Sequence, residues 1–154
     1  MNRDYFHKKI IDTIEECSYN FYVVQPNKNI SCTCTEHATK QPDTECKKCL
    51  GTGHKITIRR FRGACNDVLK GGASLGAESS KIIKNYFVNM KYPLYEDDLI
   101  IDGNEVFYVF RISHMKALKG VETHQEVTAV KKTIDHSKIL NNFYNIIKTR
   151  VSNK

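Results

Sequence analysis

Two stretches, one near each end of the chain, repeat apolar residues at the spacing of a helix. In residues 4–17, Asp4 can cap a helix whose apolar side carries Phe6, Ile10, Ile14 and Cys17. In residues 136–149 the apolar stripe consists of Ile139, Leu140, Phe143, Ile146 and Ile147. We expect this C-terminal helix to dock on the chain's own sheet, with binding to a partner as the alternative.

Between the helices the pattern changes to the alternation of β-strands. The predicted strands cover residues 19–25, 55–62, 82–90, 98–112 (a hairpin) and 121–132. Asp102-Gly103-Asn104 supplies the hairpin turn, and apolar residues on both sides of the second hairpin strand predict a central position. Two stretches are predicted to be loops. One is Pro26-Asn27-Lys28-Asn29, and the other is the glycine-rich stretch 63–80, which we expect to be mobile.

The fold class that follows is mainly β with flanking α-helices, as a small antiparallel barrel or sandwich with an inserted metal-binding hairpin. With 154 residues the chain is long enough for one domain. We expect a single domain over 1–154, with the hairpin module at 30–54, the barrel core at 82–132 and the last helix at 136–149.

Four of the six cysteines form two close pairs, Cys32-Thr33-Cys34 and Cys46-Lys47-Lys48-Cys49, separated by eleven residues. No apolar run of signal-peptide type opens the sequence, so we do not expect secretion, and paired cysteines then favour a metal site over disulfides. Four thiolates complete a closed tetrahedral shell, which predicts a structural Zn²⁺ bound by Cys32, Cys34, Cys46 and Cys49.

Two alternatives to the four-cysteine zinc site remain open. His37 or His54 could replace one sulfur, that of Cys32 or Cys34, whereas the plain alternative for each histidine is an exposed position on the surface. A redox C-x-x-C would normally follow a strand and open a helix, whereas here Leu50-Gly51-Thr52-Gly53 follows. The resulting string C-x-x-C-x-G-x-G resembles the zinc region of J-domain chaperones. The chain has one copy and no J-domain signature, so the resemblance implies a local hairpin and not a chaperone.

The chain carries 24 Lys and Arg against 17 Asp and Glu, a net charge of +7, which permits contact with nucleic acid without requiring it. Basic residues gather in 55–70 and 131–154, and acidic residues gather in 94–105. Ordinary solvated faces are the plain alternative to docking patches. No stretch approaches the roughly 18–20 apolar residues of a membrane span, so we expect no membrane association.

Sequence motifs of catalysis are largely absent, which predicts a protein that is not an enzyme. His124-Gln125-Glu126 matches the H-x-E of zinc deaminases, but the C-x-x-C that should follow it comes before it instead. A cation at Glu96-Asp97-Asp98 and a nucleophilic Cys65 are weaker candidates, because neither has a supporting group placed by spacing.

The run from Tyr95 to Ile112, YEDDLIIDGNEVFYVFRI, resembles a signature of small head–tail connector proteins of tailed bacteriophages. The resemblance covers residues 82–132, and the cysteine module with its following basic strand is similar to virion proteins of large phages. It implies a head-closure, neck or adaptor protein whose barrels form a homo-oligomeric ring below the portal. The implied partners are the portal and other connector or tail proteins, with contact to packaged DNA, in the virion and, during assembly, in the host cytoplasm.

The alternative from the residues is a zinc-ribbon protein that binds nucleic acid. In that reading the four cysteines form a scaffold for Arg59, Arg60 and Arg62.

Overall fold

The protein, seen in a computed structural model, is described over residues 3–35, 39–68, 82–91, 93–116, 122–132 and 135–152. The helices and strands follow in the order α1 (Arg3–Glu16), β1 (Tyr19–Ser31), β2 (His54–Val68), β3 (Ile82–Asn89), β4 (Leu99–Asp102), β5 (Glu105–Lys116), β6 (Glu122–Lys131) and α2 (Ser137–Ser152). The two predicted helices and the hairpin are confirmed, and the mainly β class with flanking helices is correct.

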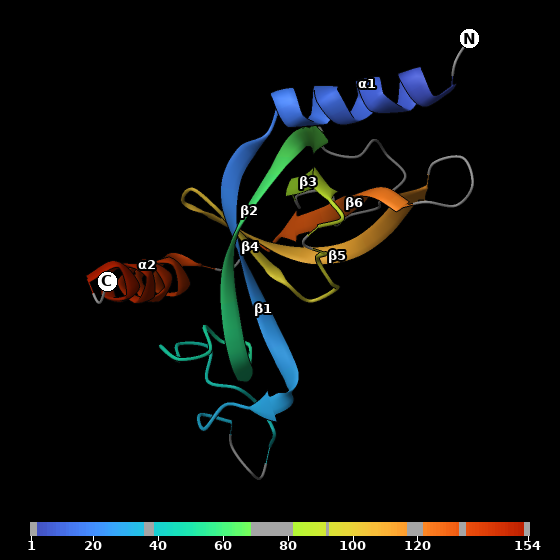
Figure 1. Cartoon of the computed structure of the whole chain (residues 1–154). Coiled ribbons are helices and arrows are strands. Elements are labelled where there is room, and N and C mark those ends of the chain that lie inside the picture. Colours follow the sequence, from blue (N-terminus) through green and yellow to red (C-terminus); the bar gives the residue numbers. More distant parts are fainter. Residues whose placement is uncertain are drawn as a thin grey trace.

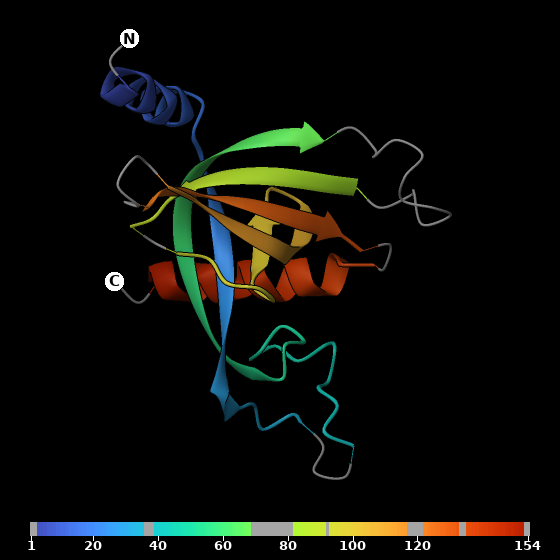
Figure 2. The same cartoon turned by 90° about the vertical axis from the view of Figure 1, so that its right-hand side faces the viewer.

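The six strands form a closed antiparallel barrel in the order β1-β2-β3-β6-β5-β4 (Figures 1 and 2). The ring closes where β4 pairs with β1, with Ile100 opposite Val23. Strands from both halves of the chain therefore make the wall, and β1 and β2 belong to the barrel together with the strands of residues 82–132.

Each strand of the β4–β5 hairpin is apolar on both sides because it separates two clusters of buried side chains. Phe107 and Ile100 face the barrel interior, whereas Val106 and Leu99 face α2 on the outside. Phe143 of α2 is fully buried in the outer cluster, and burial of one such side chain stabilises the fold by about 1.5–3 kcal/mol. The expected docking of the C-terminal helix on the chain's own barrel is thus correct.

The predicted loop at Pro26-Asn27-Lys28-Asn29 is wrong, because β1 continues to Ser31. Pro26 lies opposite Ile56 in the ladder with β2, and Asn27 lies opposite Lys55. Among the described residues, β4 pairs with β1 only over Tyr22–Val24. At Pro26 the strand therefore has one edge without a neighbouring strand, and a residue that lacks an N–H is tolerated at such an edge.

The predicted mobile loop at 63–80 is wrong over its first part, because residues 63–68 belong to β2 and pair with β3. Gly63 lies between β1 and β3, where an added Cβ would come within 2.7 Å of the carbonyl oxygen of Phe87. This glycine permits a close approach of two strands and does not mark a flexible segment. The rest of the predicted loop, residues 69–80, lies outside the described residues.

Candidate metal centre

The cysteine module lies at the tip of a two-stranded ribbon. Within the described segments, β2 pairs with β3 only from Gly63 onward, and its first residues pair with β1 alone. This part of β1 and β2 projects from the barrel, and the loop between the strands forms its end (Figures 1 and 2). The register shifts between Asn27 and Ser31, and Ser31 then lies opposite His54. Cys32 and Gly53 follow directly, so the ladder brings both ends of the module together.

The four predicted cysteines lie together, with all four sulfur atoms within 4.8 Å of one another. The Sγ atoms of Cys32 and Cys46 are 3.8 Å apart, and those of Cys34 and Cys49 are 3.5 Å apart. These distances are far too long for disulfide bonds of about 2.05 Å, and all four thiols are free. Thiolates about 2.3 Å from a tetrahedral metal ion would be about 3.8 Å apart, so the cluster has the size of a four-sulfur metal shell.

The glycines of C-x-x-C-x-G-x-G have defined steric roles. Gly51 and Gly53 have φ angles of 80° and 76°, in the left-handed region that favours glycine. An added Cβ at Gly53 would come within 2.9 Å of the Pro42 side chain, and one at Gly51 within 3.1 Å of the Thr44 carbonyl oxygen. Gly51 and Gly53 therefore pack closely on residues 42–44, and this packing closes the loop that carries Cys46 and Cys49.

Backbone hydrogen bonds shape the two cysteine turns. Cys32 N–H donates to the Gly53 carbonyl at 2.8 Å, and Leu50 N–H donates to the Cys46 carbonyl at 3.0 Å. Lys48 N–H points at the Cys46 sulfur, 3.4 Å away. An N–H directed at a sulfur stabilises the thiolate, which is the form that binds a metal ion.

The environment shifts the pKa values of Cys34, Cys46 and Cys49 in different directions. Partial burial acts to raise the pKa of Cys46, but the N–H groups of Cys49 and Lys48 outweigh it and lower that pKa to about 7. Burial raises the pKa of Cys49 to about 12, and desolvation raises that of Cys34. A bound cation would favour the thiolate form of all four.

The module is attached to α2 as well as to the ribbon. Leu50 has a left-handed backbone with a φ of 52°, and its side chain is buried in the outer cluster with Phe143. Lys138 forms an ion pair with Glu45, and the Asn142 amide donates to the Glu45 carbonyl at 3.2 Å. The cysteine module is therefore linked to the rest of the fold by the buried Leu50 side chain and by polar contacts from α2.

The two histidines that could replace a sulfur have different outcomes. His54 begins β2, and it is not part of the four-cysteine group. Its Nδ1 atom is buried and has no hydrogen-bond partner within the described part of the chain. His37 lies outside the described residues.

His124 and Glu126, the deaminase-like pair, lie on β6 with His124 Nε2 3.9 Å from the nearer Glu126 oxygen. The buried His124 ring packs against Phe87, and its Nδ1 lies 3.1 Å from the Thr123 hydroxyl. No third metal-ligating side chain joins this pair in the described ranges. A packing role accounts for these contacts.

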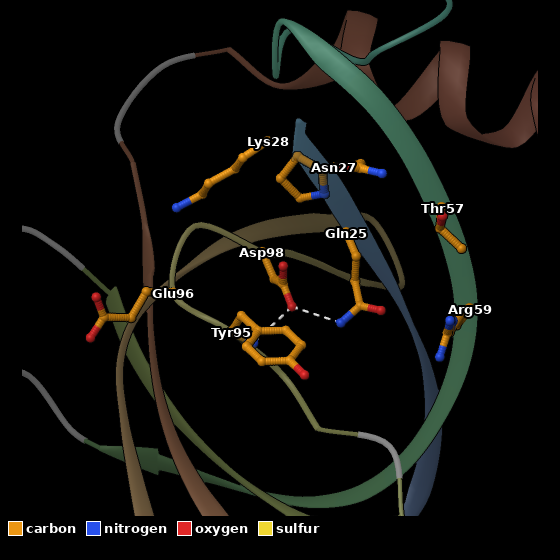
Figure 3. Close-up of a pocket in the computed structure, with 9 residues that line it drawn as sticks. Gln25, Asn27, Lys28, Thr57, Arg59, Tyr95, Glu96 and Asp98 are labelled. Atoms are coloured by element: carbon orange, nitrogen blue, oxygen red, sulfur yellow. Dashed lines mark hydrogen bonds between the residues drawn. The ribbon is translucent and has the colours of Figure 1, made fainter. Parts of the chain in front are cut away.

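The acidic segment Glu96-Asp97-Asp98 forms a tight turn that leads into β4. Asp98 is only 3% exposed, and its Oδ2 accepts hydrogen bonds from Gln25 Nε2 at 3.0 Å and from Tyr95 N–H at 2.9 Å (Figure 3). Burial raises the pKa of this carboxyl group. Asp97, with a φ of 71°, pairs with Lys28 at 3.1 Å. Both aspartates therefore hold the turn in place against β1.

The turn and the ribbon enclose an open groove of about 460 Å³. Figure 3 shows Tyr95 on one side of the groove, with Thr57 and Arg59 on the ribbon across from it.

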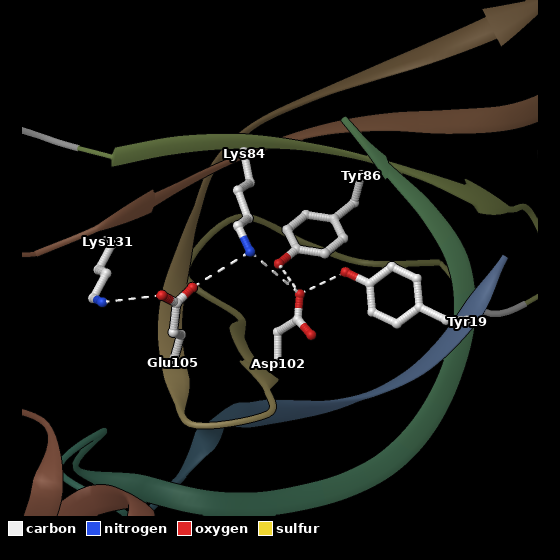
Figure 4. Close-up of polar contacts among 6 residues, drawn as sticks. All are labelled: Tyr19, Lys84, Tyr86, Asp102, Glu105 and Lys131. Carbon is white, nitrogen blue, oxygen red and sulfur yellow. Dashed lines mark hydrogen bonds and ion pairs between the residues drawn. The ribbon is translucent and has the colours of Figure 1, made fainter. Parts of the chain in front are cut away.

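One polar cluster was not predicted, because its members come from five strands. Asp102 Oδ2 accepts hydrogen bonds from Tyr19 at 2.6 Å and from Tyr86 at 2.8 Å (Figure 4). Lys84 lies between Asp102 and Glu105, at 3.8 and 3.3 Å, and Lys131 also pairs with Glu105. Cys65, the weak candidate nucleophile, lies opposite Tyr86 in the ladder and packs against the interior core. Lys84 and Tyr86 lie two residues apart on β3, and Asp102 and Glu105 face each other across the hairpin turn. No sequence spacing connects these two pairs with each other or with Tyr19, so only the fold reveals the cluster.

No protein-family model matches this chain, and no curated protein matches it at a significant level. Among the described helices, none has the length and apolar character needed to cross a membrane.

Proposed function

We propose that this chain is a structural, non-enzymatic virion protein of a tailed bacteriophage, a subunit of the head–tail connector ring below the portal. The observation that supports this most is the β4–β5 hairpin with its acidic entry, which carries the sequence resemblance. In the fold this hairpin contributes to closing a small antiparallel barrel, the architecture that the resemblance implies.

Contacts between subunits would use apolar side chains that a single chain leaves exposed. Phe110 is 69% exposed where β5 bulges, since Val109 and Arg111 face consecutive residues of β6 and Phe110 is the extra residue. Tyr95, 61% exposed, stands on the turn that Asp98 holds in place. A large apolar side chain on a fixed backbone loses little entropy when a neighbouring subunit covers it, which favours a role in an interface.

The sequence suggests that acidic residues 94–105 of one subunit face the basic stretches of the next. The structure weakens this argument for the ring, because several of these acidic residues already have partners within the chain. Asp97 pairs with Lys28, Asp102 with two tyrosines and Lys84, and Glu105 with Lys84 and Lys131. The chain's own residues already neutralise much of this acidic stretch.

The metal in this proposal is Zn²⁺, with a structural role. Four sulfur ligands at the observed spacing fill a tetrahedral shell and leave no position for a substrate. Four thiolates around Zn²⁺ carry a charge of −2, and the exposed Lys47 and Lys48 lie between two of the ligands. Elemental analysis of protein purified without added metal should find one zinc per chain. Absence of zinc, or disulfides among the four cysteines, would remove this part of the proposal.

The arrangement of the arginines supports the ring over nucleic-acid binding. Arg59 lies opposite Val23, whose side chain is in the barrel interior, whereas Arg60 lies opposite Tyr22, which packs toward α2. Neighbouring residues of a strand point to opposite faces, so Arg59 lies on one face of β2 and Arg60 and Arg62 lie on the other. The three arginines of the nucleic-acid alternative therefore do not share one surface.

The proposal is tested by deleting the gene from the phage and supplying it from a plasmid. The deletion should yield heads and tails that do not join, and the wild-type gene should restore complete particles that contain the protein. A Phe110→Ser gene should restore fewer particles, whereas Asn104→Ser in the exposed hairpin turn should restore them fully. Complete infectious particles that lack the protein would refute the proposal. Salt-sensitive binding of short DNA by the isolated monomer, together with its absence from particles, would favour the nucleic-acid alternative.

A further inference from the structure

The sulfur atoms of the cysteine cluster make two contacts that run across the module. Cys32 Sγ lies 3.8 Å from Cys46 Sγ, and Cys34 Sγ lies 3.5 Å from Cys49 Sγ. Each contact joins one cysteine of the first sequence pair to one cysteine of the second, and each thiol belongs to one of the two contacts. The four thiols can therefore react as two separate pairs without exchanging partners.

A small movement converts each contact into a disulfide bond. An S–S bond is about 2.05 Å long, so each sulfur atom has to move by only about 0.7–0.9 Å toward its partner. Cys32, Cys34 and Cys46 are half-buried and only Cys49 is buried, so each contact has at least one sulfur-bearing side chain that a small oxidant can reach.

We propose that hydrogen peroxide joins Cys32 to Cys46 and Cys34 to Cys49, and that the oxidised module keeps its fold without a metal ion. In each pair, one thiol reacts with one peroxide molecule to give a sulfenic acid and water. The second thiol then displaces the hydroxyl group as a second water and forms the S–S bond. Two thiols lose two electrons, and one peroxide is reduced to two waters. Any cation held by the cluster is released, because a disulfide offers no thiolate ligand.

The two disulfides replace the cross-link that a shared metal ion provides. They join residues that are 14 and 15 positions apart, so both bonds span the loop and hold the Cys32 turn against the Cys46 turn. The contacts that do not involve sulfur remain, including the hydrogen bond from Cys32 N–H to Gly53 and the packing of Leu50 in the outer cluster. The module therefore has two closed forms, one reduced with a cation and one oxidised without it.

This pairing has a consequence for a protein that leaves a reducing cell interior. Disulfides persist in oxidising surroundings, so the tip of the ribbon would stay closed in a virion outside the cell. The consequence rests on the proposed function, whereas the pairing follows from the positions of the four thiols and does not depend on it.

The test determines the disulfides formed in the full chain carrying Cys17→Ser, which removes an exposed cysteine outside the cluster. The protein is purified under reducing conditions, its zinc content is measured, and it is then treated with two equivalents of hydrogen peroxide. Protein without zinc at the start would count against the proposed metal and would leave the pairing to be read in the same sample.

Peptide mapping then assigns the bonds. Trypsin cleaves after Lys47 and Lys48 and so separates Cys46 from Cys49. Cys32 and Cys34 stay on one peptide, and partial reduction with two successive alkylating reagents distinguishes them by mass spectrometry. We expect the two proposed bonds to be about tenfold more abundant than all other pairings together. Dominance of any other pairing, or sulfinic acids without disulfides, would overturn the proposal.

The matched control is the same protein oxidised in urea with a chelator present. An unfolded chain should give mixed pairings enriched in cysteines that are close in sequence, because short loops close at the lowest entropic cost. The same mixture from the folded protein would show that the fold does not select the bonds.

Amide hydrogen exchange tests the second half of the proposal. Residues 32–53 of the oxidised, metal-free protein should stay as protected as in the reduced protein that holds its metal. Reduced protein treated with a chelator is the comparison and should exchange faster over this segment. Exchange in the oxidised protein as fast as in the chelated one would show that the disulfides do not hold the module closed.

Discussion

Two buried polar side chains fix a segment that has no regular secondary structure. Gln125, fully buried on β6, accepts a hydrogen bond from Leu94 N–H at 2.8 Å and donates one to the Leu94 carbonyl at 3.2 Å. The buried Asp98 carboxylate likewise accepts hydrogen bonds from Tyr95 N–H and from the Gln25 amide of β1. Buried backbone N–H and C=O groups need hydrogen-bond partners. Here Gln125 and Asp98 supply the partners that a neighbouring strand would supply in a sheet.

Asp98 provides a test at this scale. Asp98→Asn keeps an oxygen acceptor for Tyr95 N–H and Gln25 Nε2. Asp98→Ala removes the acceptor of Tyr95 N–H and leaves Gln25 Nε2 with the Pro93 carbonyl alone, which should destabilise the fold by about 1–3 kcal/mol. Because burial raises the pKa of Asp98 in the folded state, its contribution is fully present below the unfolded pKa of about 4. The contribution is lost as pH rises through the folded value. Urea unfolding should therefore show wild type losing stability relative to Asp98→Asn as pH rises through that range. An unchanged difference would contradict the assignment.

Gly63 gives a second prediction. In Gly63→Ala the new methyl group meets the Phe87 carbonyl oxygen at 2.7 Å and the Phe21 ring at 3.2 Å, so β1 or β3 must move. We expect a loss of about 1–3 kcal/mol in the free energy of unfolding, typical of overpacking. Gly103→Ala is the comparison, because a Cβ added at Gly103 has no atom within 4 Å. Only the left-handed backbone, with a φ of 60°, is unfavourable for alanine there, and we expect it to lower the free energy of unfolding by about 1–2 kcal/mol. Equal stability of Gly63→Ala and wild type in thermal unfolding would show that the strands can separate freely.

At the scale of elements, periodicity predicted which segments become helices and strands but misplaced several ends. β1 runs past Pro26 because none of the described strands pairs with the other edge of β1 at this residue. The sequence does not show which edge of a strand lacks a neighbour. β2 runs through Gly63 because a glycine that permits strand contact looks the same in sequence as a glycine in a loop.

The cysteine cluster was predictable because its spacing is local. The Asp102 cluster was not, because its partners are close only after the barrel closes.

The cysteine module gives a prediction at the scale of elements. Cys46→Ser should lose the metal and increase amide hydrogen exchange over residues 32–53, since a module of this size has little core of its own. Exchange should also rise in α2 around Phe143, because Leu50 of the module packs there. The interior strands should stay protected. Cys17→Ser, at an exposed cysteine outside the cluster, is the matched control. Unchanged exchange at 32–53 in Cys46→Ser would show that the module folds without metal.

For the whole molecule, the polar cluster at Asp102 ties five barrel strands together. Tyr19 comes from β1, Lys84 and Tyr86 from β3, Asp102 from β4, Glu105 from β5 and Lys131 from β6. Lys84 also lies 4.8 Å from the centre of the Phe107 ring, which connects the cluster with the interior core. Because its members come from five strands, the cluster stabilises the closed barrel as a whole.

Alkaline pH should weaken this closure. Burial, followed by the nearby Asp102, raises the pKa of both Tyr19 and Tyr86. Desolvation acts to lower the pKa of Lys84, but the charges of Asp102 and Glu105 outweigh it and raise that pKa. A raised folded pKa means a contribution that is complete below the unfolded pKa, about 10 for both residue types, and is lost as pH rises through the folded value. The urea midpoint should fall above about pH 10, and by less in Tyr86→Phe. That variant should itself lose about 1.5–3 kcal/mol at pH 8. A midpoint independent of pH would contradict this account.

The ribbon that connects the barrel to the cysteines also bears on how the chain folds during synthesis. The four thiols and the strands that carry them lie within residues 19–68, so they emerge from the ribosome before β4, β5 and β6 exist. Contacts close in sequence form with little loss of loop entropy, whereas the β1–β4 closure joins distant segments and is slow. An ion captured early would hold β1 and β2 in register as a template. The strands β4, β5 and β6 would then pair with strands that are already aligned. Unpaired strand edges would be exposed for less time, which would reduce aggregation.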